Sequence, residues 1–430
     1  MLVVLVGNEI KPEQVQLQGC WDLTSSILLS TDETGSDPFN DMKLTFNTTL
    51  TLHPLQIHPD RKHYIVEDSL SGDYYEMPQV CIDAIELLNK GKTLGEIETA
   101  LIHDYPEEAV ELIPFAEQLV ELGLVKEIDG EQVGQKKKNH APSGLEWVPV
   151  RAGTFFFNAI TVKLYWVFFV VNIIFVVWNP WLLPSYADIF LFDSMMMSMA
   201  AYLIISLVLI IIHESGHILA TRAHGLPANL EIGHRLFLVV FETDLTPAWK
   251  LTPKQRNRLY FAGMSFEQVI LFIAFCFILF VPFEDALYIG IMKLVVFDLF
   301  VKFIYQCCFY MKTDMYYAVE NLSGCYNLME RGKAFLRSRI GNEDNGDYQN
   351  EAKTVKYYSV FYLCGIMLMA GLFFLFFLPQ ALFAFSESFR HIMNYTVTSP
   401  YFWDAVAFFT QVFLMLGLLL YGILKHKASR

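Results

Sequence analysis

The sequence has few basic residues and no paired-cysteine motif, and each shortage excludes a class of function. Its 31 Lys and Arg are outnumbered by 45 Asp and Glu, giving a net charge of −14. A nucleic-acid-binding protein needs a basic surface, so nucleic acid is excluded as a partner. The seven cysteines include no CxxC pair, which argues against a disulfide framework and against a cysteine zinc site.

A signal-peptide core is also missing from the first residues. The apolar stretch at positions 1–6 has no basic flank and is shorter than such a core requires. We therefore expect the N-terminal part of the chain to stay in the cytoplasm.

Charge and hydrophobicity are distributed unevenly along the chain. Residues 1–150 hold 26 acidic and 10 basic residues, a net of −16, whereas residues 151–430 hold 19 and 21, a net of +2. Hydrophobic residues make up 54% of the whole, which is above the usual share of a soluble protein. The sequence therefore predicts an acidic soluble head joined to a nearly neutral, apolar body.

The apolar body contains six stretches of membrane-spanning length. Of the 21 basic residues after position 150, 18 fall on one side of the resulting layout and only Arg390 lies in a loop on the other. By the positive-inside rule this asymmetry places both termini in the cytoplasm. We predict a polytopic α-helical membrane domain over 158–424, followed by a cytoplasmic tail over 425–430. The spans are expected near 158–183, 195–217, 259–282, 286–311, 357–379 and 402–424.

The head shows a mixed α/β pattern. Partial alternation predicts a strand within 43–53, and the Ser71-Gly72 turn signal predicts a hairpin around it. A helix is expected from Pro78 to Asn89. Thr93 and Glu96 form a capping box that opens a second helix. A third is expected from about Pro106, ending at Gly123.

These elements predict three segments before the membrane domain. Residues 1–57 form a β-rich extension, 58–130 a small α+β domain of winged-helix type, and 131–157 a linker. The linker carries three consecutive lysines at 136–138, whose charge favours the membrane surface.

The sequence His213-Glu214-Ser215-Gly216-His217 follows an almost wholly apolar run. Two His spaced i and i+4 lie on one face of a helix, where they can bind a single zinc ion. Glu214 between them is placed to take a proton from the attacking water. Ionisable groups at the end of a membrane span are costly, and for that reason they are functional by default.

A zinc site of this type needs a third protein ligand. Asp314 follows the fourth expected span at its cytoplasmic end, where the HExxH motif also ends its own span. Two spans of the same direction bring such ligands to one depth, so Asp314 is the favoured third ligand. The alternatives are His224, Glu231, Glu242 and Asp244.

With these residues the chain resembles the site-2 protease family of intramembrane zinc metalloproteases, in its peptide zinc metalloprotease branch. In that family one core span carries HExxH and a later one supplies an Asp ligand, usually from Asn-Pro-x-x-Asp-Gly. His213, Glu214, His217 and Asp314 match these roles. The Asn-Pro is absent here, and Met315 stands in place of the Gly. The resemblance covers roughly 195–330 and implies a bacterial plasma-membrane protease.

Two further acidic residues fall in the segment covered by the resemblance. Glu267 stands where many relatives have Asn, which makes it a candidate residue lining the active site. Asp244, in Phe241-Glu242-Thr243-Asp244, is a second candidate for lining the site. The alternative is a structural role, in which the Glu267 carboxyl pairs with another polar group within its span.

Residues 60–130 resemble the PqqD-like peptide chaperones, small winged-helix domains that bind a leader peptide as an added strand. The resemblance rests on the paired strands with a Gly turn, on residues 87–93 and on Leu122-Gly123-Leu124-Val125. It implies a peptide substrate held by the head, with an exporter or a peptide-modifying enzyme as partner. A regulatory or purely scaffolding head is the alternative.

The expected function is therefore a membrane-embedded zinc endopeptidase that processes the precursor of a ribosomally made, modified and secreted peptide. Two alternatives remain open. One is a regulatory intramembrane protease that cleaves a transmembrane signalling protein. The other is a non-catalytic, peptide-binding subunit of an exporter.

Overall fold

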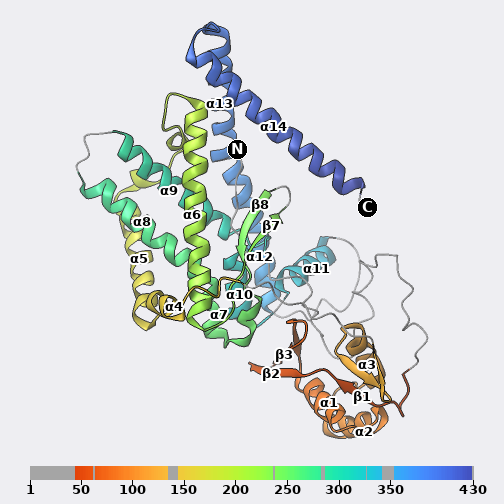
Figure 1. Ribbon diagram of the computed structural model, residues 1–430. Coiled ribbons are helices and arrows are strands. Elements are labelled where there is room, and N and C mark those ends of the chain that lie inside the picture. Colours follow the sequence, from red (N-terminus) through yellow and green to blue (C-terminus); the bar gives the residue numbers. More distant parts are fainter. Residues whose placement is uncertain are drawn as a thin grey trace. The chain divides into compact units, whose positions relative to one another are not determined.

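The computed structural model describes residues 44–61, 63–133, 144–235, 238–281, 286–325, 327–340 and 353–428 of the 430-residue chain. Within these ranges the chain is mostly helical (Figure 1) and divides into two compact units. One contains the head and the other contains nearly all of the apolar body. Most of the extension expected at 1–57, and the middle of the expected linker, lie outside the described residues.

The head consists of two small antiparallel sheets and three helices. The sheets have the strand orders β1-β5-β6 and β2-β3-β4. The helices are α1 (Gln79–Asn89), α2 (Leu94–Asp104) and α3 (Leu112–Glu121), and the strands are β1 (Leu50–Leu52), β2 (Leu55–Asp60), β3 (His63–Asp68), β4 (Tyr74–Met77), β5 (Val125–Ile128) and β6 (Glu131–Gln132). Buried aliphatic and aromatic side chains from the helices and from both sheets form one hydrophobic core.

Several local predictions for the head are confirmed. β3 and β4 form the expected hairpin, with Gly72 in the left-handed region at φ 80°. The capping box is present in both directions: Glu96 donates its N–H to Thr93, and Thr93 donates its N–H to the Glu96 carboxylate. The helix after Pro78 begins at Gln79.

The predicted start of the third helix is wrong. α3 begins at Leu112 rather than near Pro106, because the Glu98 carboxylate accepts the N–H of Leu112 and satisfies the first turn there. The strand expected within 43–53 is also shorter than predicted, since β1 covers Leu50–Leu52 only and a turn closed by Thr45 and Thr48 precedes it.

The boundaries expected at 57 and 131 do not coincide with breaks in the fold. β1 pairs with β5, so residues before position 58 belong to the sheets of the head. At the other end β6 pairs with β5, and α4 (Val150–Phe156) packs against α6. Both ends of the expected linker are therefore structured.

The apolar body is built from long helices. The main ones are α5 (Ala159–Trp178), α6 (Met195–Ala223), α7 (Pro253–Tyr260), α8 (Ala262–Phe280), α9 (Ala286–Gln306), α10 (Asp314–Ser323), α11 (Leu328–Ile340), α12 (Lys353–Leu372), α13 (Leu378–Asn394) and α14 (Pro400–Ala428). A hairpin of β7 (Leu230–Arg235) and β8 (Leu238–Thr243) follows α6. α14 continues past the boundary expected at 424.

Four of the described helical segments are long and apolar enough to cross a membrane, which marks the chain as a membrane protein. They are Ala159–Trp178, Met195–Ala223, Ala262–Phe280 and Lys353–Asn394. α9 and α14 occupy the fourth and sixth expected spans and are not among these four. α9 has the length but carries three charged residues, Lys293, Asp298 and Lys302. The six-span layout therefore stays a prediction.

The last of these segments combines α12 and α13 through a π-helical turn, Phe373–Phe377. Pro379 follows this turn. Because proline has no N–H, it cannot continue the α-helical hydrogen-bond pattern, and the preceding turn loosens.

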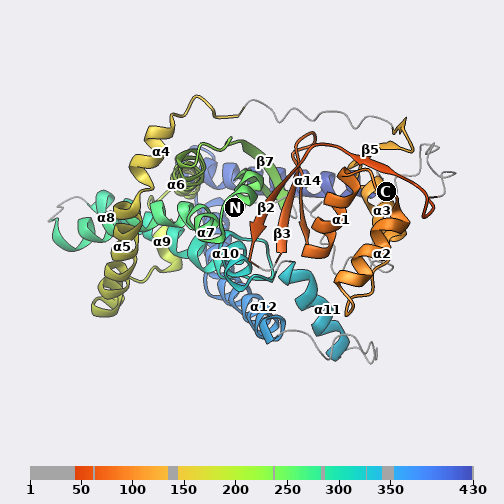
Figure 2. The ribbon, with the colours of Figure 1, turned by 90° about the horizontal axis from the view of Figure 1, so that it is seen from below.

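α6 is the central helix of the body. It packs against α4, α8 and α9, and Figures 1 and 2 show α8 and α9 beside it. α6 and α9 run in the same direction. Lys302 on α9 donates to the Ser206 carbonyl on α6. One turn later on α9, Gln306 bonds to Asp314, which in turn contacts His213, a residue later on α6. A buried ion pair between Lys302 and Asp298, 2.6 Å apart, lies in this interface.

The first turn of α6 is capped by a carboxylate from α14. Asp404 accepts the backbone N–H groups of Met195 and Met196, at 2.9 and 3.1 Å, and the hydroxyl of Ser194. These bonds satisfy N–H groups that an isolated helix would leave without partners. The beginnings of α6 and α14 therefore lie at the same level.

Candidate metal centre

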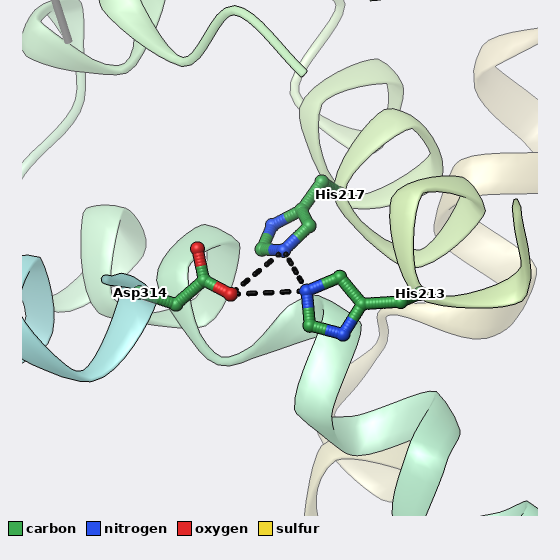
Figure 3. Close-up of side chains that lie close together, drawn as sticks. All are labelled: His213, His217 and Asp314. Atoms are coloured by element: carbon green, nitrogen blue, oxygen red, sulfur yellow. Dashed lines mark hydrogen bonds and ion pairs between the residues drawn. The ribbon is translucent and has the colours of Figure 1, made fainter. Parts of the chain in front are cut away.

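Three buried side chains meet near the end of α6 (Figure 3). His213 and His217 come from α6, and Asp314 is the first residue of α10. All three have a relative exposure of 0%. Asp314 Oδ2 lies 3.0 Å from His213 Nε2 and 3.4 Å from His217 Nε2, and the two Nε2 atoms are 3.1 Å apart.

These distances fit a shared metal ion. Ligand atoms about 2.0–2.1 Å from a tetrahedral zinc lie about 3.3 Å from one another. The three measured separations, 3.0, 3.1 and 3.4 Å, are close to that value.

The contacts on the far sides of the rings favour a metal over direct bonding among the three groups. His217 Nδ1 lies 2.9 Å from the carbonyl oxygen of Leu259, at the end of α7, which can only accept. His213 Nδ1 lies 3.0 Å from Glu267 Oε1 on α8. A neutral imidazole that carries its proton on Nδ1 presents a lone pair at Nε2. Two lone pairs and a carboxylate oxygen then face one point, and a cation there would satisfy all three.

Asp314 is held by Gln306, the last residue of α9. The Gln306 amide donates to Asp314 Oδ2 at 2.9 Å, and its oxygen accepts the Asp314 N–H at 3.1 Å. The Thr313 hydroxyl also donates to the Gln306 carbonyl.

Glu214 lies beside the cluster without belonging to it. Its Oε2 accepts a hydrogen bond from the Thr243 hydroxyl on β8 at 2.7 Å. Its Oε1 is buried and has no hydrogen-bond partner among the described residues. A buried carboxylate oxygen of this kind needs a donor, and a water molecule at the cluster would supply one.

Close approach of α8 to α6 shapes the site. A Cβ atom at Gly263 would lie 2.3 Å from His213 Nε2, and one at Gly216 would lie 2.6 Å from the Ala262 carbonyl oxygen. Only glycine at these two positions lets the helices pack this closely without displacing the imidazole.

The structure separates the sequence-based candidates for the third ligand. Among the described residues, the cluster of metal-ligating atoms consists of His213, His217 and Asp314. The other candidates lie outside it: His224, Glu231, Glu242 and Asp244. His224 is the residue after α6, where burial and the charge of Arg258 lower its pKa. The Asp244 N–H donates to the Asn229 carbonyl at the end of the β7–β8 hairpin.

Sequence reasoning missed Thr243, Gln306 and the Leu259 carbonyl. A signal existed for Gln306, which continues the polar face of α9 formed by Asp298 and Lys302 at four-residue spacing. Thr243 and Leu259 reach the site from a hairpin and from a backbone carbonyl, for which the sequence carries no periodic signal.

Comparison with family models, with curated proteins and with solved structures finds no match.

Proposed function

We propose that the protein is a membrane-embedded zinc endopeptidase with a site-2 protease-like core, in which His213, His217 and Asp314 hold the metal and Glu214 is the general base. The observation that carries the proposal is the convergence of three acceptor atoms from α6 and α10. Beside them lies a Glu214 oxygen that no described residue hydrogen-bonds. Zinc suits two imidazoles and one carboxylate, with a fourth position left for water or substrate.

The residues of the chain divide the chemistry among them. Bound zinc supplies a Lewis acid that polarises the scissile carbonyl and the attacking water. Glu214 Oε1 accepts a proton from that water, while Thr243 fixes Oε2 and so aims the carboxylate. The same carboxyl then donates the proton to the leaving amine. Leu259 and Gln306 orient His217 and Asp314.

The head supports a peptide substrate. In the described sheet β2-β3-β4 the outer strands are β2 and β4, and an extended peptide can add to an outer strand of a sheet. Together with the resemblance of residues 60–130 to peptide chaperones, this favours the precursor of a modified secreted peptide. The same proposal places the cleavage near the cytoplasmic face and both termini in the cytoplasm. It also includes an exporter or a modifying enzyme as partner. The two outer strands equally suit a scaffolding head or an exporter subunit.

The test compares the parent protein with Glu214→Gln. The substitution keeps the size of the side chain and an oxygen that can accept from Thr243, but it removes the proton acceptor. Zinc content and substrate binding should persist, while cleavage of a precursor peptide falls on the order of a hundredfold or more. Cleavage by the Gln variant at the parental rate would remove Glu214 from the role of base. A parent that binds peptide and cleaves nothing would favour the exporter subunit.

A further inference from the structure

Glu267 is a buried carboxylate that the proposed reaction leaves without a role. It lies on α8, is 5% exposed, and its Oε1 is 3.0 Å from His213 Nδ1. Neither atom makes a hydrogen bond of acceptable angle to a described residue. The contact between them is therefore a close electrostatic one. An ionisable group buried in a membrane helix is costly unless a partner offsets it, and His213 is the partner at hand.

We propose that Glu267 is a positioning residue of the metal centre: its carboxylate, 3.0 Å from His213 Nδ1, favours the tautomer with the proton on Nδ1, keeps the Nε2 lone pair aimed at the metal, and places negative charge behind this ligand. The inference rests on the proposed function for its metal. It assigns to Glu267 a role through His213, whereas a residue lining the site would touch the substrate.

The packing of α8 explains why the carboxylate reaches the ring. Gly263 and Glu267 are four residues apart and so lie on one face of α8. The absence of a side chain at Gly263 brings the His213 ring against the helix. The next residue, Gln268, contacts a different helix: Asn172 on α5 donates to its carbonyl and amide oxygens at 2.9 and 3.0 Å.

The two histidines are thereby made unequal. His217 faces a neutral carbonyl at Leu259, whereas His213 faces a carboxylate. A carboxylate partner raises the basicity of the imidazole that it contacts, and outer partners of this kind are worth about 10- to 100-fold in metal affinity. His213 should therefore be the stronger of the two nitrogen ligands.

The experiment measures zinc affinity of the full-length protein in detergent, by competition with a chromophoric chelator, for Glu267→Gln, Glu267→Leu and Gln268→Leu. Glu267→Gln keeps an acceptor oxygen and removes only the charge, so its affinity should fall by about tenfold. Glu267→Leu removes the acceptor as well and should lose up to about 100-fold. Gln268→Leu removes the amide oxygen that accepts from Asn172 but leaves the bond from Asn172 to the Gln268 backbone carbonyl, so this variant should bind zinc like the parent.

A second readout is the visible spectrum of the cobalt-substituted protein, which reports the ligand field. It should shift in Glu267→Gln and stay parental in Gln268→Leu. Parental affinity and spectrum in both Glu267 variants would overturn the positioning role and leave the proposed function standing. Equal losses in the Glu267 and Gln268 variants would overturn it in favour of helix packing. A parent that binds no zinc would overturn the proposed function together with this inference.

Discussion

Asp314 and His224 are the two residues that best separate the possible metal sites. Asp314 lies in the cluster, and His224 lies at the end of the same helix as His213 but outside the cluster. Asp314→Ala removes one of three ligands, so zinc affinity should fall by more than the roughly 100-fold that the loss of an outer partner costs. His224→Ala should leave the zinc content unchanged. Metal analysis of the purified proteins checks both, and the opposite pattern would move the third ligand to the end of α6.

The sequence predicted the residues of the cluster better than it predicted their surroundings. Spacing alone placed His213 and His217 on one helical face, with Glu214 between them. Asp314 was favoured because its span and the HExxH span were expected to run in the same direction. α6 and α9 do run in the same direction, and Asp314, which follows α9, lies beside His213. Thr243 could not be predicted, because its position depends on how the β7–β8 hairpin folds back on α6.

At the scale of elements, the decisive feature is the close approach of α8 to α6. We predict that Gly263→Ala weakens zinc binding sharply, because the new Cβ would lie 2.3 Å from His213 Nε2 and force the ring away from the metal. Gly371→Ala is the matched control, since a Cβ atom there meets nothing within 4 Å. The control should bind zinc normally and gain a little stability from the better helix propensity of alanine.

Zinc affinity and thermal unfolding of these two glycine variants are measured side by side. Normal zinc binding by Gly263→Ala would show that α8 lies farther from α6 than the structure has it.

Element boundaries illustrate what local sequence patterns leave out. The capping box of α2 is a contact within one turn, and it was predicted correctly. The start of α3 depends on the Glu98 carboxylate, which reaches Leu112 from another helix, so a pattern search over the segment after Pro106 could not find it. β1 was located only approximately because its register comes from pairing with β5, more than 70 residues later in the sequence.

At the scale of the whole molecule, the orientation in the membrane remains a prediction with a direct test. Single cysteines at Leu230 and Val397, both exposed, are placed in a cysteine-free background. The six-span layout puts Val397 outside and Leu230 in the cytoplasm. An impermeant thiol reagent should then label position 397 in intact cells, and position 230 only after permeabilisation. Labelling of position 230 in intact cells would invert the layout and place the metal at the outer face.

The carboxylate of Asp404 ties the stability of α6 to the order of synthesis. α6 leaves the ribosome long before Asp404, which lies 210 residues after Ser194. Until α14 is in place, the N–H groups of Met195 and Met196 lack the carboxylate that accepts them, and the first turn of α6 has only the Ser194 cap on Met197. The loss of such an acceptor costs about 1 kcal/mol in water and more where lipid excludes water. The helix that carries the proposed zinc ligands therefore reaches its final stability only after α14 has been made and has packed against it.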